Sequence, residues 1–232
     1  MERERALADL DRLRDGLVVS CQARDDNPLH GPRFMTAMAQ AAVLGGAVGI
    51  RADGVDDVTA IREALSPEVP IIGIFKVKQP DRSLFITPDA ESARRVLKAG
   101  ARLVALDGTP RPRPGGEPLS DVVKAIQQSG GAALADIGTF DDAVHAVACG
   151  VDAVGTTLSG YTPDSPQLPG PDFALLEQLV RELSVPVFAE GRIWTREDAR
   201  RALDLGAAFV VVGTAITNPT AITARFTAAM RA

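Results

Sequence analysis

Short apolar segments recur along this chain, and segments with helical periodicity separate them. Eight of the apolar segments are rich in Val, Ile and Ala and nearly continuous, as expected of strands that are buried on both faces of a parallel sheet. They span residues 17–22, 47–51, 70–76, 101–107, 132–136, 152–156, 186–190 and 208–213. The intervening segments, such as DDVTAIREAL, ESARRVLKAG and DFALLEQLVREL, carry apolar residues at helical spacing. The pattern predicts that strand and helix alternate.

Several of the predicted helices end at a glycine just before the next strand, as in LGGAVGI, KAGARLV, ACGVDAV and DLGAAFV. Glycine adopts the left-handed conformation that commonly closes a helix. Eight such units, joined by right-handed crossovers, can close into a barrel. We therefore predict an α/β protein with a single (β/α)₈ barrel domain over residues 1–232, in which residues 1–15 form a helix that closes the barrel bottom. The alternative is a doubly wound open sheet, which normally carries a glycine-rich loop after its first strand, where this chain reads CQARDDNPLHGP.

Composition and charge narrow the functional classes. The 232-residue chain is 46% hydrophobic and 24% charged, which is typical of a globular protein. Its net charge of −5 argues against a nucleic-acid-binding surface, which normally has a basic excess. No apolar run approaches the roughly 18 residues of a membrane span, and MERERALADLDRLRDG predicts a charged amphipathic helix instead of a signal peptide. We expect a cytoplasmic protein with no nucleic-acid or membrane partner.

The cysteines and histidines indicate no metal or cofactor chemistry. Cys21 and Cys149 are too few for a disulfide framework, and their small apolar neighbours predict buried thiols. No His, Cys or Asp grouping has metal-ligand spacing, so we expect neither a metal nor a cofactor. His145 lies among valines and alanines and is interpreted as structural. His30 lies in a loop, where it either contacts a substrate or packs against the loop.

Polar residues end the predicted strands. In barrel enzymes, the strand ends at one rim carry the chemistry. Two cations, Arg51 and Lys76, and two carboxylates, Asp136 and Glu190, would surround one mouth and shift one another's pKa values. For any one of these residues, the alternative is that it has no functional role and is charged only because the strand ends at the solvent. The strand ends that we predict to contact a substrate, besides Lys76 and Glu190, are Gln22, Arg51, Asp136 and Thr156.

The last two predicted strands are each followed by glycine. Gly191 and Arg192 follow Glu190, and the eighth strand ends in Gly213 and Thr214. Backbone N–H groups and a short helix can converge on an anion there, because glycine lets the backbone approach closely. The alternative is that both glycines only form tight turns. We predict a phosphate site at these four residues, and hence a small phosphorylated substrate.

Several stretches of the chain, taken together, resemble a known family. They include GLVVSCQ, GGAVGIRADG, PIIGIFKV, TTLSGYTPDSP, PVFAEGRI and VVGTAIT, which occur in this order between Leu17 and about Arg225. On these motifs the chain is similar to N-acetylmannosamine-6-phosphate 2-epimerases. The resemblance implies a ribulose-phosphate-binding type of TIM barrel and an isomerase that interconverts N-acetylmannosamine 6-phosphate and N-acetylglucosamine 6-phosphate in sialic-acid catabolism. Together with the amphipathic final helix, it also suggests a homodimer.

The resemblance implies roles for individual residues. It makes Lys76 in GIFKV and Glu190 in AEGRI catalytic, and it makes Gln22, Arg51 and Asp136 substrate contacts. Our hypothesis is that Lys76 exchanges the proton at C2 of the open-chain sugar, while the like charge of Arg51 lowers the pKa of its amine. Glu190 would assist ring opening and act as a second acid or base.

The chain departs from the family pattern at three places. It has Asp107-Gly108-Thr109 where the family usually has DAT, Asn218 where the family usually has the arginine of ITRP, and Trp194 where asparagine is common. Asn218 removes one expected phosphate contact, which Arg192 or backbone amides would have to replace.

Two other functional classes stay open at this point. Another phosphosugar barrel, such as an aldose–ketose isomerase or an indole- or thiazole-forming synthase, would use the same phosphate loops. A noncatalytic phosphosugar sensor would bind without turnover. A lysine at the end of the third predicted strand together with a glutamate at the end of the seventh favours the epimerase over both.

Overall fold

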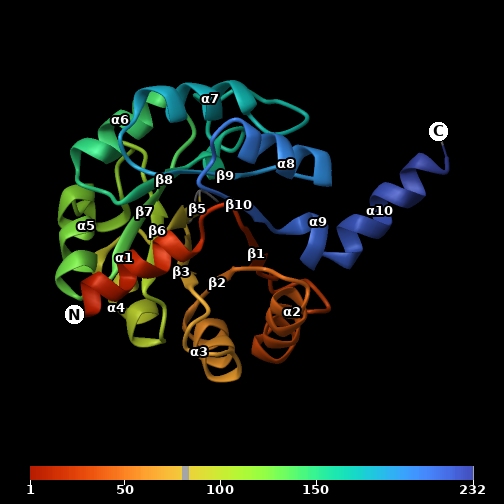
Figure 1. Ribbon diagram of the computed structural model, residues 1–232, viewed down its shortest axis with the longest axis horizontal. Helices are drawn as coiled ribbons and strands as arrows, with labels where there is room; N and C mark the ends of the chain where they lie inside the picture. The colour runs from red at the N-terminus through yellow and green to blue at the C-terminus, as the bar shows by residue number, and fades with distance from the viewer. Residues whose placement is uncertain (80–83, 232) are drawn as a thin grey trace.

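The computed structural model describes residues 1–79 and 84–231. Eight parallel strands form a closed barrel in the spatial order β1-β10-β9-β8-β7-β6-β3-β2, which confirms the predicted (β/α)₈ barrel (Figure 1). The strands are β1 Leu17–Cys21, β2 Gly49–Asp53, β3 Ile71–Ile74, β6 Leu103–Asp107, β7 Ala132–Asp136, β8 Ala153–Gly155, β9 Val187–Glu190 and β10 Phe209–Val212.

Helices surround the barrel and connect its strands (Figure 1). Their bounds are α1 Glu2–Arg12, α2 Pro32–Leu44, α3 Val55–Ala64, α4 Ala90–Lys98, α5 Leu119–Gln128, α6 Phe140–Ala148, α7 Phe173–Glu182, α8 Arg196–Asp204, α9 Thr214–Thr217 and α10 Pro219–Ala229, with 3₁₀ turns η1 Pro114–Gly116 and η2 Thr156–Leu158. The glycines expected to close helices have left-handed φ angles of 96°, 106°, 87° and 95° at Gly46, Gly100, Gly150 and Gly206. The predicted helix ends are therefore confirmed.

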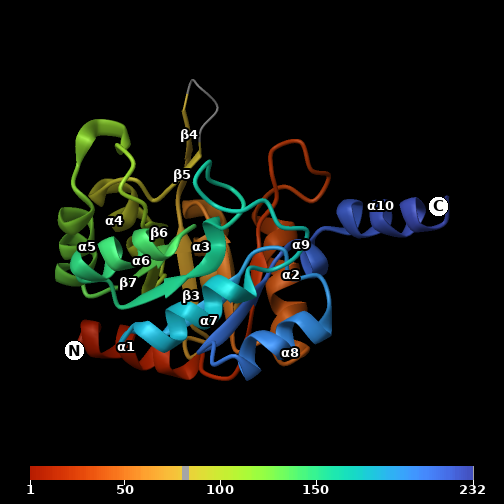
Figure 2. The ribbon, with the colours of Figure 1, turned by 90° about the horizontal axis from the view of Figure 1, so that it is seen from above.

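The third predicted strand, residues 70–76, differs from the structure. β3 ends at Ile74, and Lys76 begins a separate strand, β4 Lys76–Lys78, which pairs antiparallel with β5 Leu84–Ile86. Thr87 anchors this hairpin, because its Oγ accepts from the Phe75 N–H at 3.1 Å and donates to the Ala105 carbonyl of β6 at 2.7 Å. Lys76 thus lies on a hairpin that rises above one end of the barrel (Figure 2).

The opposite end of the barrel is covered by α1 (Figure 2). Its apolar residues Ala6, Leu10 and Leu13 belong to the same buried cluster as barrel-interior residues. Asp9, which is 1% exposed, pairs with Arg102 just before β6 at 2.6 Å. These contacts place α1 against the amino-terminal ends of the strands, so the carboxyl ends form the accessible mouth.

Two phenylalanines fill the barrel interior below that mouth. Phe188 of β9 and Phe209 of β10 stack with ring centroids 4.9 Å apart and planes 6° apart. Gly155 of β8 makes room for them, because a Cβ there would lie 2.0 Å from the Phe188 ring. The interior is therefore packed side chains rather than a pore, as in other barrels of this type.

The two cysteines differ from each other in burial. Cys21 is buried as predicted, whereas Cys149 at the end of α6 is partly exposed, so the prediction of two buried thiols was wrong for Cys149. His145 lies one helical turn away, with Nε2 3.9 Å from the Cys149 sulfur. His30 contacts its own loop, with Nδ1 3.1 Å from the Ala23 carbonyl oxygen. Among the described residues, no helix is long and apolar enough to cross a membrane.

Candidate active site

A buried ion pair crosses the barrel interior beneath its mouth. Arg51 of β2 donates to Asp136 of β7 through Nη1 to Oδ1 at 3.0 Å and through Nη2 to Oδ2 at 2.6 Å. Both side chains are at most 1% exposed. Burial alone would lower the pKa of Arg51, but the neighbouring carboxylates raise it overall, so the guanidinium stays charged.

Glu190, the last residue of β9, shares this arginine. Its Oε2 lies 2.9 Å from Arg51 Nη1, and its side chain is 13% exposed. Burial raises the pKa of Glu190 to about 7, and the charge of Asp136 acts in the same direction, while Arg51 and Lys76 oppose the shift. A carboxyl group with such a pKa can donate or accept a proton near neutral pH.

Two consecutive threonines after β8 hold Glu190 in different ways. The hydroxyl of Thr156 donates to the Glu190 carbonyl oxygen at 2.9 Å and accepts from the Glu190 N–H at 3.2 Å. The hydroxyl of Thr157 lies 2.6 Å from Asp136 Oδ1 and 3.3 Å from Glu190 Oε2. Thr156, which we predicted as a substrate contact, therefore fixes the backbone of Glu190, and Thr157 is the threonine whose side chain contacts the carboxylates.

Lys76 lies at the rim, with 33% of its side chain exposed. Its amine donates to Gln22 Oε1 and lies 3.8 Å from Asp53 Oδ2. Gln22 is held in turn by a 2.6 Å bond from Nε2 to the Ser20 hydroxyl. The pKa of Lys76 is lowered, as expected, although burial is the largest cause; Asp53 opposes the shift, and Arg51 adds to it.

One strand connects the two candidate catalytic groups. Arg51 and Asp53 are alternate residues of β2, so both point into the barrel while Ala52 between them packs outward. Arg51 contacts Glu190, and Asp53 contacts Lys76. The charges of Lys76 and Glu190 also shift each other's pKa. The predicted residues Gln22, Arg51, Lys76, Asp136 and Glu190 therefore belong to one linked set of polar groups.

The loops predicted to bind phosphate follow adjacent strands, since β9 pairs with β10. Gly191 and Arg192 have left-handed φ angles of 109° and 54°, and Gly213 precedes the four-residue helix α9, which begins at Thr214. The Arg192 guanidinium turns toward the loop after β8, where it donates to the Ser159 carbonyl at 2.6 Å and to the Gly170 carbonyl at 2.8 Å. The Arg192 guanidinium is therefore engaged by the loop after β8, and the groups that remain for an anion at these positions are backbone N–H groups.

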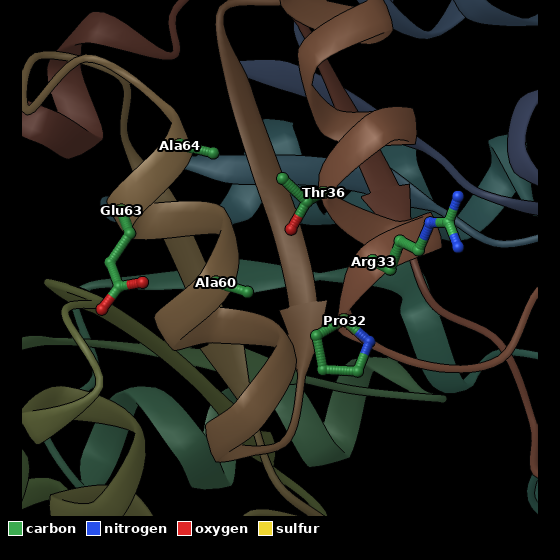
Figure 3. Close-up of a pocket in the computed structure, with 6 residues that line it drawn as sticks. All are labelled: Pro32, Arg33, Thr36, Ala60, Glu63 and Ala64. Carbon is green, nitrogen blue, oxygen red and sulfur yellow. The ribbon is translucent and has the colours of Figure 1, made fainter.

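Other strand-end and surface features form contacts of their own. Asp107, at the end of β6, organises its own loop, because its Oδ1 accepts from the N–H and the hydroxyl of Thr109 at 3.0 and 2.6 Å. No group of three potential metal ligands occurs in the part of the chain that the structure describes. Figure 3 shows a surface depression between α2 and α3, which contains none of the predicted site residues. Its lining residues are Pro32, Arg33, Thr36, Ala60, Glu63 and Ala64.

Comparison with known proteins identifies the family. The model of a family described as "Putative N-acetylmannosamine-6-phosphate epimerase" matches residues 35–232. The chain belongs to this epimerase family. Relatives named "Putative N-acetylmannosamine-6-phosphate 2-epimerase" are 47% identical over 219 residues in Caldanaerobacter subterraneus subsp. tengcongensis (94% of this chain and 92% of the relative) and 49% identical over 218 residues in Clostridium perfringens (94% and 98%).

A solved structure agrees with this assignment. The N-acetylmannosamine-6-phosphate 2-epimerase from Clostridium perfringens has a TM-score of 0.91 at 48% identity, covering 95% of each chain. Thiamine phosphate pyrophosphorylase from Pyrococcus furiosus has a TM-score of 0.63 at 17% identity, covering 91% of this chain and 90% of that one. The second likeness shows a shared fold alone.

Two departures from the epimerase family pattern have local explanations in the structure. Asn218 caps α10, because its Oδ1 accepts from the Ala221 N–H at 3.0 Å. Trp194 lies beneath the guanidinium of Arg225 on α10, with the Arg225 Cζ 4.1 Å from the ring centroid. Asn218 therefore helps to fix the start of α10, and Trp194 helps to hold that helix in place through Arg225.

Sequence reasoning missed one member of the site, Asp53, and it did not distinguish the role of Thr157 from that of Thr156. Asp53 follows Arg51 at the two-residue spacing of a strand, and this spacing could have indicated that both point inward. Thr157 follows Thr156 directly, and only the turn into η2 decides which of the two hydroxyls faces the carboxylates.

Proposed function

We propose that this chain interconverts N-acetylmannosamine 6-phosphate and N-acetylglucosamine 6-phosphate by exchanging the proton at C2. Membership of the epimerase family supports the substrate and the reaction class. The observation that carries the mechanism is that an amine with a lowered pKa, Lys76, and a carboxyl with a raised pKa, Glu190, belong to one network at the barrel mouth. This is the acid and base pairing that proton exchange requires.

The difficult step is removal of the C2 proton. In the open-chain sugar this proton lies next to the C1 aldehyde, and its loss leaves an enolate with charge on O1. The proton has a pKa of roughly 17, against about 10.4 for a reference lysine, so direct transfer is uphill by about 9 kcal/mol. Positive groups near the developing oxyanion must offset much of this difference. Arg51 supplies positive charge at the mouth, and Lys76 adds to it as its amine takes up the proton.

Lys76 acts as the base in this mechanism. Its neutral amine takes the C2 proton, and the electron pair of the C2–H bond forms the C1–C2 double bond of the enolate. A proton then returns to C2 on the opposite face, which inverts the configuration. The returning proton comes either from Lys76 itself or from the neutral carboxyl of Glu190, which also assists opening of the sugar ring.

The phosphate is held by the loops after β9 and β10. The backbone N–H groups of Gly191 and Arg192, and those at the start of α9 after Gly213, including Thr214, supply donors without any requirement for an arginine at position 218. The paired strands and the left-handed backbone at Gly191 and Arg192 support this arrangement. The Arg192 guanidinium fixes the neighbouring loop by its two carbonyl contacts.

One experiment tests the reaction. The purified protein is mixed with N-acetylmannosamine 6-phosphate in deuterated water and followed by NMR. We expect N-acetylglucosamine 6-phosphate to appear with deuterium at C2. Binding without turnover would support a phosphosugar sensor instead, and formation of a ketose would support an aldose–ketose isomerase.

Unphosphorylated N-acetylmannosamine tests the phosphate site. We expect kcat/KM for this sugar to fall by at least about a thousandfold, which is equivalent to about 4 kcal/mol of lost transition-state binding. Equal values for both sugars would reject a phosphate site.

The final helix supports a homodimer. α10 projects away from the barrel (Figures 1 and 2), and none of its residues is buried. Phe226 and Met230, four residues apart along one face, are 70% and 84% exposed. Large apolar side chains exposed in this way are typical of a surface that a second copy covers. Light scattering after gel filtration should give twice the chain mass, and Phe226→Glu should give a monomer; a monomeric parent protein would reject the dimer.

A further inference from the structure

Asp53 contacts the candidate base through two different atoms. Its Oδ1 accepts from the Lys76 backbone N–H at 3.0 Å, and its Oδ2 lies 3.8 Å from the Lys76 amine. The side chain of Asp53 is 26% exposed. The Asp53 carboxylate therefore contacts both the backbone of Lys76, where strand β4 begins, and the amine at the end of the Lys76 side chain.

The local backbone explains why Asp53 reaches this position. Asp53 is the last residue of β2 and pairs with Ile74, the last residue of β3. The following Gly54 N–H donates to the Ile74 carbonyl at 2.9 Å, which ties the two strand ends together. Beyond Ile74 the chain leaves the barrel ladder, and the carboxylate of Asp53 accepts the N–H of Lys76 there.

The charges that act on the Lys76 amine come from three strands. Asp53 and Arg51 lie on β2, Asp136 on β7 and Glu190 on β9, and the neutral amide of Gln22 follows β1. Asp136 and Glu190 are already paired with Arg51. Asp53 is therefore the carboxylate whose charge is directed at Lys76, and it is also the largest of the charged influences on the pKa of that amine.

We propose that Asp53 is the positioning residue of Lys76: it fixes the lysine backbone and stabilises the ammonium that forms as the C2 proton is transferred. The catalytic part of this proposal rests on the proposed function, in which Lys76 is the base. Burial lowers the pKa of the Lys76 amine, and Asp53 opposes this shift and so strengthens the amine as a base, because a nearby negative charge favours the charged form. In this role Asp53 acts on the reaction through Lys76.

Asp53→Asn separates the two contacts. The amide oxygen can still accept from the Lys76 N–H, while the negative charge is removed. The first measurement does not depend on turnover. The chain contains four lysines, Lys76, Lys78, Lys98 and Lys124, so protein labelled with carbon-13 at lysine Cε should give four resonances, and Lys76→Arg assigns the one that belongs to position 76.

We expect the Lys76 resonance of Asp53→Asn to titrate at lower pH than in the parent protein, and the Lys78 resonance of the same strand to titrate unchanged. Asp56→Asn is the matched control, because Asp56 is an exposed carboxylate on α3 and carries the same charge. An unchanged Lys76 titration in Asp53→Asn, or an equal shift in Asp56→Asn, would overturn the proposal.

The second measurement is steady-state turnover. We expect Asp53→Asn to lower kcat by about tenfold with little change in KM, because the charge acts on proton transfer rather than on binding. Asp53→Glu should recover part of kcat, and Asp56→Asn should match the parent enzyme. A parental kcat in Asp53→Asn would overturn the positioning role. Absence of turnover in the parent protein would reject the epimerase function instead, and the titration would still decide whether Asp53 controls the lysine.

Discussion

Arg51 and Asp136 form a two-point ion pair across the barrel interior, with Nη1 to Oδ1 at 3.0 Å and Nη2 to Oδ2 at 2.6 Å. The parallel geometry makes each hydrogen bond charge-assisted and fixes the plane of the guanidinium. That plane directs Nη1 to Glu190 as well, at 2.9 Å. The position of Glu190 therefore depends on a residue of β2, three strands away from β9 around the barrel, which no local motif near Glu190 specifies.

Removal of Arg51 should destabilise the fold strongly. Arg51→Met leaves two carboxylates, Asp136 and Glu190, buried without their cation, and breaking a buried pair in this way costs about 3–5 kcal/mol. Urea denaturation of the variant and the parent protein measures the difference. Arg200→Met removes a solvent-exposed ion pair with Asp204 and should change stability little. Equal effects of the two substitutions would show that the barrel does not depend on the buried pair.

Loss of the Lys76 amine should abolish proton exchange. Lys76→Met removes the base, so deuterium from the solvent should no longer enter C2 of the sugar phosphate. Lys78→Met is the matched control, because Lys78 lies on the same short strand β4 and should retain exchange. NMR in deuterated water measures both variants. Exchange that persists in Lys76→Met would reject this lysine as the base.

The pH dependence of kcat/KM should change slope near neutrality. Since burial raises the pKa of Glu190 to about 7, its carboxyl is mostly neutral below that pH and mostly ionised above it. Glu190→Gln should lower kcat by about a hundredfold or more, the usual contribution of a general acid or base. Its residual activity, measured from pH 5.5 to 9, should lack the break near pH 7. A break that persists belongs to another group.

Asp57 should make stability depend on pH in the mildly acidic range. Burial raises the pKa of Asp57 from 3.8 to about 6, so the folded protein binds this proton more tightly than the unfolded chain does. Stability contributed by this group is therefore lost as the pH rises from about 4 to about 6. Above that range, Asp57→Asn should be more stable than the parent protein by on the order of 1 kcal/mol. Urea denaturation at pH 4 and pH 8 measures it, and a difference that is the same at both values would contradict the prediction.

The sequence was sufficient for the barrel and for most of the candidate site. Strand burial, helical periodicity and the glycines that close helices are local properties, because each follows from the period of the backbone or from a left-handed φ that glycine tolerates. The parallel arrangement of the strands then placed their final residues at one rim. Gln22, Arg51, Asp136 and Glu190 could be predicted as neighbours on this basis alone.

Tertiary structure decided how those residues are connected. Lys76 was predicted as the end of a barrel strand but begins a hairpin, because Thr87 and Asp53 offer its segment hydrogen bonds that the barrel ladder does not. The rotation of the chain into η2 made Thr157, instead of Thr156, the hydroxyl that contacts both carboxylates. Hydrogen-bond partners and burial depend on residues brought together from distant strands, and these contacts set the pKa values of Lys76 and Glu190. The sequence by itself determined which chemical groups lie at the mouth. The tertiary structure determined their contacts and burial, and hence the pKa values of Lys76 and Glu190.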